Sequence, residues 1–207
     1  WARRCVSETA VARGMGLDGR IGKKFQHAGP GYGGTCFPQD TMAMIRMAQE
    51  FGTSSRIVEA VVEVNASQKA RMVSKVKDAL GGSVADKTIA VLGLTFKPQT
   101  DDMRDAPSLA ILPPLMDRGA EIRAHDPQGM EEAKLELPPG IHYAEGIEDA
   151  VTGADAVILL TEWNEYRGLD LGRIKELMNG DVFVDLRNVY EPEPMRALGF
   201  QYSCVGR

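Results

Sequence analysis

The chain shows two patterns of hydrophobic and polar positions, and the change between them falls near residue 80. Before that point, apolar residues recur every three or four positions. Residues 1–13 fit the end of a helix, and a second helix is predicted from 38 to 51, with Pro38 in its first turn. A third stretch, 55–80, contains neither glycine nor proline, so it predicts one unbroken helix about 39 Å long.

After residue 86, short apolar runs alternate with segments long enough for crossover connections. The predicted strands are 88–94, 120–125, 155–161, 181–186 and 201–205. This alternation predicts a parallel sheet covered on both faces. We therefore assign the α/β class, with a central helical region over 1–80 and a doubly wound, Rossmann-like domain over 81–207. Within the first crossover, Pro113 and Pro114 predict a broken or kinked helix.

Two basic residues follow predicted strands at the place where such sheets bind ligands. Parallel α/β sheets hold their ligands beyond the carboxyl ends of the strands. Lys97 lies in the long segment TFKPQTDDMRDA (95–106) after the first strand, and Arg187 follows the fourth. A lone surface cation is usually only solvated. Their shared position favours a role for both in ligand binding.

Residues 27–40, HAGPGYGGTCFPQD, contain a misleading glycine pattern. Gly29, Gly31 and Gly34 have the G-x-G-x-x-G spacing of a dinucleotide-binding turn. Such a turn needs a buried strand before it and an acidic residue about 20 positions later. The preceding KKFQHA is not a buried strand, and TSSRI (53–57) contains no acid. We therefore interpret the match as accidental.

Cys36, two residues after the last of these glycines, is a candidate nucleophile. Glycines let the backbone approach a ligand and leave room beside the thiol. The start of the helix predicted from Pro38 favours the thiolate form, which is the reactive one. Asp40, in the predicted first turn, is placed to orient water or accept a proton. The alternative is a small buried cysteine beside an ordinary turn, the expected role of Cys5 and Cys204.

Composition excludes several classes of protein. The 207 residues are 43% hydrophobic and 26% charged, which is typical of a globular chain with a real core. A net charge of −5 provides no general attraction for nucleic acid or anionic lipid, and no apolar run is long enough to span a membrane. Three dispersed cysteines and three dispersed histidines form no disulfide framework or metal site, and they favour the cytoplasm. Because the chain begins at Trp1 within a helical pattern, we expect it to be part of a longer protein.

Several motifs, in order and over essentially the whole chain, resemble the UDP-glucose/GDP-mannose dehydrogenase family. They are GPGYGGTCFPQD, GLTFKPQTDDMRDAPS, Asp126-Pro127, TEWNEY, DLRNVY and the terminal CVGR. The resemblance implies oxidation of a nucleotide sugar at C6 to a carboxylate, in two NAD-dependent steps. It implies that Cys36 captures the aldehyde as a thiohemiacetal that becomes a thioester, and that Asp40 assists water and proton transfer.

The resemblance also implies further site residues and partners. Substrate contacts would come from Arg20 (reaching across from a neighbouring subunit), His27, Gly29, Gly31, Tyr32, Gly33, Phe96, Lys97 and Arg187, and contacts to NAD from Cys36 and Arg104. A homodimer through helix 55–80 is implied as well. The family's NAD-binding domain, with its catalytic Lys and Asn, would precede Trp1, and Gln39 replaces the family's usual Lys.

Two other interpretations stay open. The chain in isolation could be a UDP-binding and dimerisation module without chemistry of its own. Its substrate could also be another nucleotide sugar, such as GDP-mannose or a UDP-N-acetylhexosamine. Tyr32, Phe37 and the terminal 205–207 resemble the UDP-glucose branch more closely. We therefore expect a UDP-glucose dehydrogenase whose isolated part here is inactive, binds UDP weakly and binds NAD hardly at all.

Overall fold

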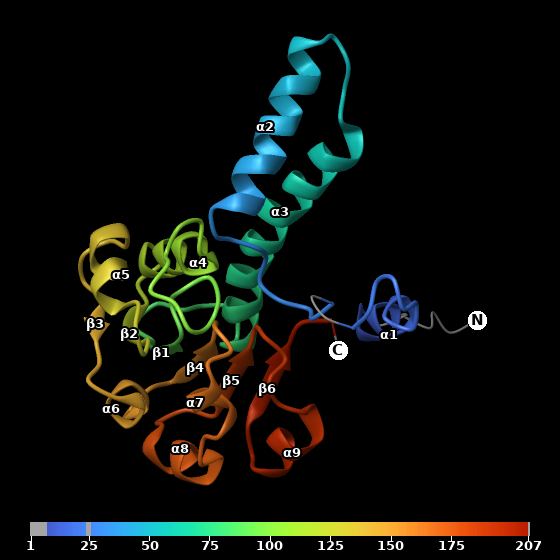
Figure 1. Cartoon of the computed structure of the whole chain (residues 1–207). Helices are drawn as coiled ribbons and strands as arrows, with labels where there is room; N and C mark the ends of the chain where they lie inside the picture. Colours follow the sequence, from blue (N-terminus) through green and yellow to red (C-terminus); the bar gives the residue numbers. More distant parts are fainter. Residues whose placement is uncertain (1–7, 24–25, 207) are drawn as a thin grey trace.

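A helical hairpin stands on a sheet domain in the computed structural model, which describes residues 8–23 and 26–206 (Figure 1). The helices before the sheet are α1 (Glu8–Met15), α2 (Cys36–Glu50) and α3 (Arg56–Ala79). The long helix α3 confirms the prediction for 55–80. Helix α2 begins at Cys36, two residues earlier than predicted, because Thr35 already has near-helical angles (φ −97°, ψ −57°). Asp40 consequently lies one turn after Cys36 and not in the first turn.

The sheet contains six parallel strands in the order β3-β2-β1-β4-β5-β6. Their bounds are β1 (Thr88–Leu92), β2 (Glu121–His125), β3 (His142–Tyr143), β4 (Ala156–Leu159), β5 (Val182–Asp185) and β6 (Gln201–Cys204). This order is that of a Rossmann fold, and its topological switch point lies between β1 and β4. The predicted fold class is confirmed, whereas β3 was not predicted because its two residues form no apolar run.

Helices cover both faces of the sheet, so its strands alternate between two cores. On β1, Ile89 and Val91 belong to one buried cluster, and Ala90 and Leu92 belong to the other. The first core contains residues of α3, α4 (Pro107–Met116) and α5 (Met130–Glu136). The second is covered by α6 (Ile147–Val151), α7 (Asn164–Arg167), α8 (Leu171–Leu177) and α9 (Pro192–Ala197). Burial on both faces accounts for the nearly continuous apolar runs of the central strands.

Helix α3 belongs to both parts of the molecule. Its last turns bury Met72, Val73 and Val76 in the first core, where the helix lies beside β5 and β6. Its first turns form the projecting hairpin with α2 (Figure 1). The single helix therefore fixes where the segment before α2 meets the carboxyl edge of the sheet.

Helix α4 continues through Pro113 and Pro114, so the predicted break is wrong. The two prolines have no N–H to donate to the preceding turn. Three neighbours, Ile111, Leu112 and Leu115, are fully buried against the sheet. Apolar packing therefore holds the helix where its own hydrogen bonds are incomplete.

Candidate functional site

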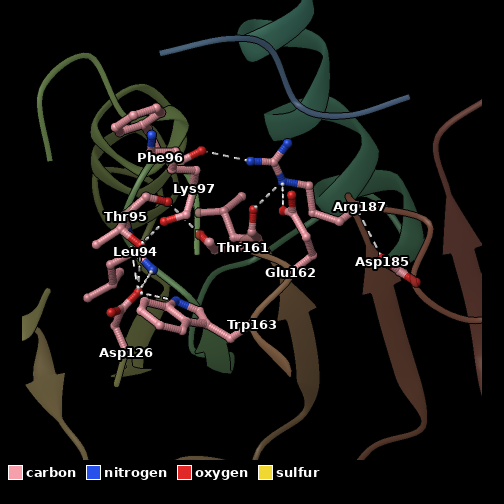
Figure 2. A network of polar contacts seen from close by, with 11 residues as sticks. Leu94, Thr95, Phe96, Lys97, Asp126, Thr161, Glu162, Trp163, Asp185 and Arg187 are labelled. Carbon is pink, nitrogen blue, oxygen red and sulfur yellow. Dashed lines mark hydrogen bonds and ion pairs between the residues drawn. The ribbon is translucent and has the colours of Figure 1, made fainter. Parts of the chain in front are cut away.

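The loops at the topological switch point are fastened by one buried carboxylate (Figure 2). Asp126, directly after β2, is fully buried. Its Oδ2 accepts hydrogen bonds from the amides of Leu94 (2.7 Å) and Thr95 (3.2 Å) and from the indole of Trp163 (3.2 Å). Its Oδ1 accepts from the amide of Gly129 at 2.8 Å. Three strands, β1, β2 and β4, thereby present their following loops in one arrangement.

The backbone that carries Phe96 and Lys97 is also held from β4 and β5 (Figure 2). Thr161 donates from its hydroxyl to the Thr95 carbonyl at 2.6 Å, and Arg187 Nη2 donates to the Phe96 carbonyl at 2.9 Å. The Lys97 ammonium lies 5.1 Å from the centre of the Phe96 ring. Lys97 itself is exposed. The structure therefore brings Phe96, Lys97 and Arg187 together at the carboxyl edge of the sheet, as predicted from their positions after strands.

Arg187 is mostly buried and spends much of its bonding capacity on protein. Its Nε donates to the Leu160 carbonyl at 3.0 Å and lies 2.9 Å from Glu162 Oε2. Because that N–H points to the carbonyl, the contact with Glu162 is a charge pair and not an aligned hydrogen bond. Burial lowers the pKa of Arg187, and the Glu162 carboxylate opposes this shift. The guanidinium is thus a fixed positive group whose Nη1 faces Gly29.

The glycine loop, which we define as residues 27–35, packs directly on the β1–α4 loop, residues 93–106. A Cβ at Gly33 would lie 2.9 Å from the carbonyl carbon of Asp105, and a Cβ at Gly34 would lie 2.9 Å from the Phe96 ring. Gly34 also donates from its amide to the Arg104 carbonyl at 2.8 Å. No strand precedes Gly29 in residues 26–28, which agrees with an accidental fingerprint match. These glycines allow two protein segments to meet.

Cys36 is exposed at the start of α2, close to the β1–α4 loop. The pKa of Arg104 is raised chiefly by its hydrogen bond to Asp102, and the nearby Cys36 sulfur adds a smaller electrostatic contribution. Arg104 Nη2 lies 2.7 Å from Asp102 Oδ2, and its side chain is 66% exposed. Asp40, four residues after Cys36, follows it on the same side of the helix and is exposed. The two predicted catalytic residues and Arg104 therefore lie in one neighbourhood.

Helix α3 holds the glycine loop from the other side through residues that the sequence analysis did not single out. The Tyr32 amide donates to Asn65 Oδ1 at 2.8 Å, and Asn65 Nδ2 donates back to the Tyr32 carbonyl at 3.3 Å. Gln68 Nε2 donates to the Gly29 carbonyl at 2.9 Å. Lys69 Nζ donates to both the carbonyl and the carboxylate of Asp105 at 3.0 Å. The available signal was a set of polar residues at i, i+3 and i+4 on one helix face.

Other predicted residues lie apart from this neighbourhood or show no printed contact with it. The Arg20 guanidinium, 90% exposed, is paired with Asp18 at 2.6 Å in the turn after α1. His27 is exposed at the start of the glycine loop, and the Tyr32 ring packs edge-on against Phe37, with ring centres 4.8 Å apart. Cys204 is buried in β6, as expected of a core residue, whereas Cys5 lies outside the described residues.

A cavity of about 780 Å³ borders the back of the glycine loop, between α2, α3 and α4. Tyr32, Asn65 and Lys69 line it, together with apolar residues of the three helices. Its lining does not include Cys36 or Arg187. In the described part of the chain, no group of His, Cys, Asp or Glu residues is arranged to hold a metal ion. None of the helices in residues 8–23 and 26–206 is long and apolar enough to cross a membrane.

Comparison with known families gives two adjacent matches. Residues 6–67 match the central domain of the UDP-glucose/GDP-mannose dehydrogenase family, and residues 90–192 match the UDP binding domain of the same family. Together the two matches include the glycine loop, α2, most of the sheet and both ligand-binding loops.

Individual relatives agree with these matches. The chain is 51% identical to UDP-glucose 6-dehydrogenase of Rhizobium meliloti over 95% of its own length and 45% of that protein. It is 46% identical to UDP-glucose 6-dehydrogenase YwqF of Bacillus subtilis, over 96% and 45%. The structure of a UDP-glucose dehydrogenase from Pyrobaculum islandicum superposes with a TM-score of 0.83 at 35% identity, covering 99% of this chain and 44% of that one. The chain thus spans about half the length of the relatives it matches.

Proposed function

The chain belongs to the UDP-glucose/GDP-mannose dehydrogenase family, and on this premise we propose that it forms the UDP-sugar-binding and cysteine-bearing part of an NAD-dependent UDP-glucose 6-dehydrogenase. The observation that carries the proposal is the contact between the glycine loop and the β1–α4 loop. Through Gly33 and Gly34, that contact places the thiol-bearing start of α2 beside Phe96 and the switch point of the sheet. A nucleotide held by the sheet would then direct its sugar toward Cys36.

The chemistry we propose for Cys36 is covalent capture of the sugar aldehyde. The thiolate adds to the C6 carbonyl carbon, and the carbonyl oxygen takes up a proton to give a thiohemiacetal. Loss of hydride from C6 converts this adduct to a thioester. Water then adds to the thioester carbon, the C–S bond breaks, and the thiolate leaves as the carboxylate forms. Asp40, one helical turn from Cys36, is placed to accept the proton of that water.

NAD would accept the hydride in both oxidation steps, and the chain offers it an edge and not a complete site. Cys36 and Arg104, both exposed, would face the cofactor. The turn after β1 does not fit a pyrophosphate, because a Cβ at Gly93 would lie 2.5 Å from the Thr161 side chain. A dinucleotide turn needs open backbone at this position. We therefore assign this sheet to the UDP-sugar and only a contacting role to the two exposed residues.

UDP-glucose is the substrate favoured by the relatives, while the other nucleotide sugars remain alternatives. The relatives at 51% and 46% identity are UDP-glucose 6-dehydrogenases by name. We further propose that residues 1–80 and 81–207 are separate domains, since the two family matches end at 67 and begin at 90. The isolated chain would then act as a binding module that cannot complete turnover.

We also propose a homodimer formed through the α2–α3 hairpin. The hairpin projects from the sheet domain (Figure 1). It exposes a series of large apolar side chains, Met44, Met47, Phe51, Ile57 and Val64, each at more than half of its full area. Such a concentration on one projecting element is typical of an interface. Light scattering at tens of micromolar should find a dimer, and Ile57→Lys should shift it toward a monomer; a monomeric unmodified chain would contradict the proposal.

The function is tested by measuring UDP, UDP-glucose and NAD separately by titration calorimetry. We expect UDP and UDP-glucose to bind weakly and NAD to bind hardly at all. The variant Arg187→Met should lose nucleotide binding, with Arg173→Met, on the exposed surface of α8, as the matched control. Tight NAD binding without UDP binding would show that the sheet domain has been assigned to the wrong ligand.

A further inference from the structure

One face of α3 joins the two loops that would meet at the sugar. Asn65 and Lys69 are four residues apart and therefore project from the same side of the helix. Asn65 bonds the glycine loop through Tyr32, and Lys69 bonds the β1–α4 loop through Asp105. The two loops are distant in sequence, and α3 provides them with a common support.

The bonding of Asn65 fixes a backbone segment unusually completely. Its side-chain amide both accepts from and donates to Tyr32, so it replaces the neighbouring strand that this irregular segment lacks. The adjacent Gly31 has φ +122°, and a Cβ there would lie 2.8 Å from Asn65 Oδ1. The sequence of the loop and the amide of α3 are thus fitted to each other. Tyr32 lies four residues before Cys36, so its position determines where α2 begins.

Lys69 fixes the opposite loop at a strained residue. Only 6% of Lys69 is exposed, although its ammonium carries a full charge. It donates to the carbonyl and the carboxylate of Asp105, which has the left-handed angle φ +50°. A residue other than glycine adopts that conformation at some cost and needs support from its surroundings. The Asp105 carbonyl is also the group that Gly33 approaches most closely.

We propose that Asn65 and Lys69 are positioning residues, which set the separation between the Cys36 loop and the nucleotide-binding β1–α4 loop. The proposal rests on the proposed function, because that separation matters only if the sugar of a bound nucleotide must reach the thiol. Neither residue touches the reacting atoms. Their effect is exerted through Tyr32 and Asp105, and it should therefore appear in how the sugar covers Cys36 and not in how the nucleotide binds.

The test compares two readouts in the 207-residue chain and in Asn65→Leu, which keeps the size of the side chain and removes both amide bonds. Calorimetry measures UDP affinity. Peptide mass spectrometry measures the rate at which iodoacetamide alkylates Cys36, with and without saturating UDP-glucose. Ser67→Leu, an exposed position on the same helix, is the matched control for the added apolar group. Lys69→Met, which keeps the aliphatic stem, gives an independent second variant.

We expect UDP-glucose to slow alkylation of Cys36 in the unmodified chain and in Ser67→Leu. Asn65→Leu and Lys69→Met should lose most of this protection while their UDP affinity changes by less than about threefold, since each loses only bonds between the loops. Protection equal to that of the unmodified chain in both variants would overturn the proposal. Loss of UDP affinity in parallel with protection would also overturn it, because general damage to the fold would then explain both.

Hydrogen exchange separates this proposal from the proposed function. In Asn65→Leu, amides of residues 29–36 should exchange about tenfold faster, the effect of losing one or two ordinary hydrogen bonds. Amides of β1 and β4 should be unchanged. This readout needs no ligand, so a chain that fails to bind UDP would refute the proposed function alone. Unchanged exchange in residues 29–36 would refute the positioning role even if UDP-glucose binds.

Discussion

Replacing Gly33 with alanine should separate the two halves of the proposed site. The backbone angle of Gly33 suits any residue, because its φ lies outside the left-handed region, so the effect is one of space alone. The added Cβ would lie 2.9 Å from the carbonyl carbon of Asp105, closer still to its oxygen, and 3.1 Å from Phe96 Cβ. Contacts below 3.0 Å are not tolerated, so one loop must move.

The magnitude follows from what holds Asp105 in place. Its carbonyl accepts from the buried Lys69 ammonium at 3.0 Å, and a hydrogen bond to a charged group is worth about 1.5–3 kcal/mol. Forcing a methyl group into a packed site typically costs about 1–3 kcal/mol. Both routes give a loss of about 2 kcal/mol, or roughly 4–8 °C in Tm for a chain of this size.

Thermal unfolding followed by circular dichroism measures the stability, and calorimetry measures UDP-glucose affinity. Gly146→Ala is the matched control, because a Cβ at Gly146 meets no atom within 4 Å. We expect Gly33→Ala to lower both Tm and UDP-glucose affinity relative to that control. If the two variants behave alike in both measurements, the contact between Gly33 and Asp105 does not constrain the loops, and the description of the site is wrong.

Three further predictions concern single side chains. Asp126→Asn should lower the free energy of unfolding by about 2–6 kcal/mol in urea, because its new amide would face buried N–H donors that cost about 1–3 kcal/mol each when unpaired; exposed Asp101→Asn is the control, and equal midpoints would contradict the role of Asp126. Burial lowers the pKa of His125, so the unfolded chain binds more protons and the free energy of unfolding should fall as pH drops below about 6.5; His125→Gln should flatten that slope, and an unaltered slope would exclude His125 as its source. Iodoacetamide should alkylate exposed Cys36 well before buried Cys204, as read by peptide mass spectrometry, and the reverse order would exclude an accessible nucleophile.

The fold could be predicted from the sequence where burial leaves a simple record. Strands β1, β4 and β5 are buried on both faces, and each is a continuous apolar run. Helix α3 was predictable because nothing in residues 55–80 interrupts it. The same reasoning missed β3, whose two residues are held by pairing with β2 and not by their own apolar character. It failed at Pro113-Pro114 because burial of α4 outweighs the missing hydrogen bonds.

The site was predictable where a residue's place in the topology determines its surroundings. Lys97 and Arg187 could be assigned from the strand ends that precede them. The contacts of Gly33 with Asp105 and of Asn65 with Tyr32 depend on how α3 lies across the sheet, which no local pattern records. Arg187 also differs from the simple expectation of a free cation, because two backbone carbonyls and Glu162 occupy it.

A crystal structure of the chain with UDP-glucose tests the central claim most directly, namely that the sheet holds the nucleotide and the glycine loop presents Cys36 to its sugar. We predict the diphosphate beside Lys97 and Arg187 at the carboxyl edge of β1 and β5. We predict sugar C6 within about 3.5 Å of Cys36 Sγ, the separation of reacting atoms before attack. A nucleotide bound instead in the cavity between α2, α3 and α4, or a sugar directed away from Cys36, would contradict the account.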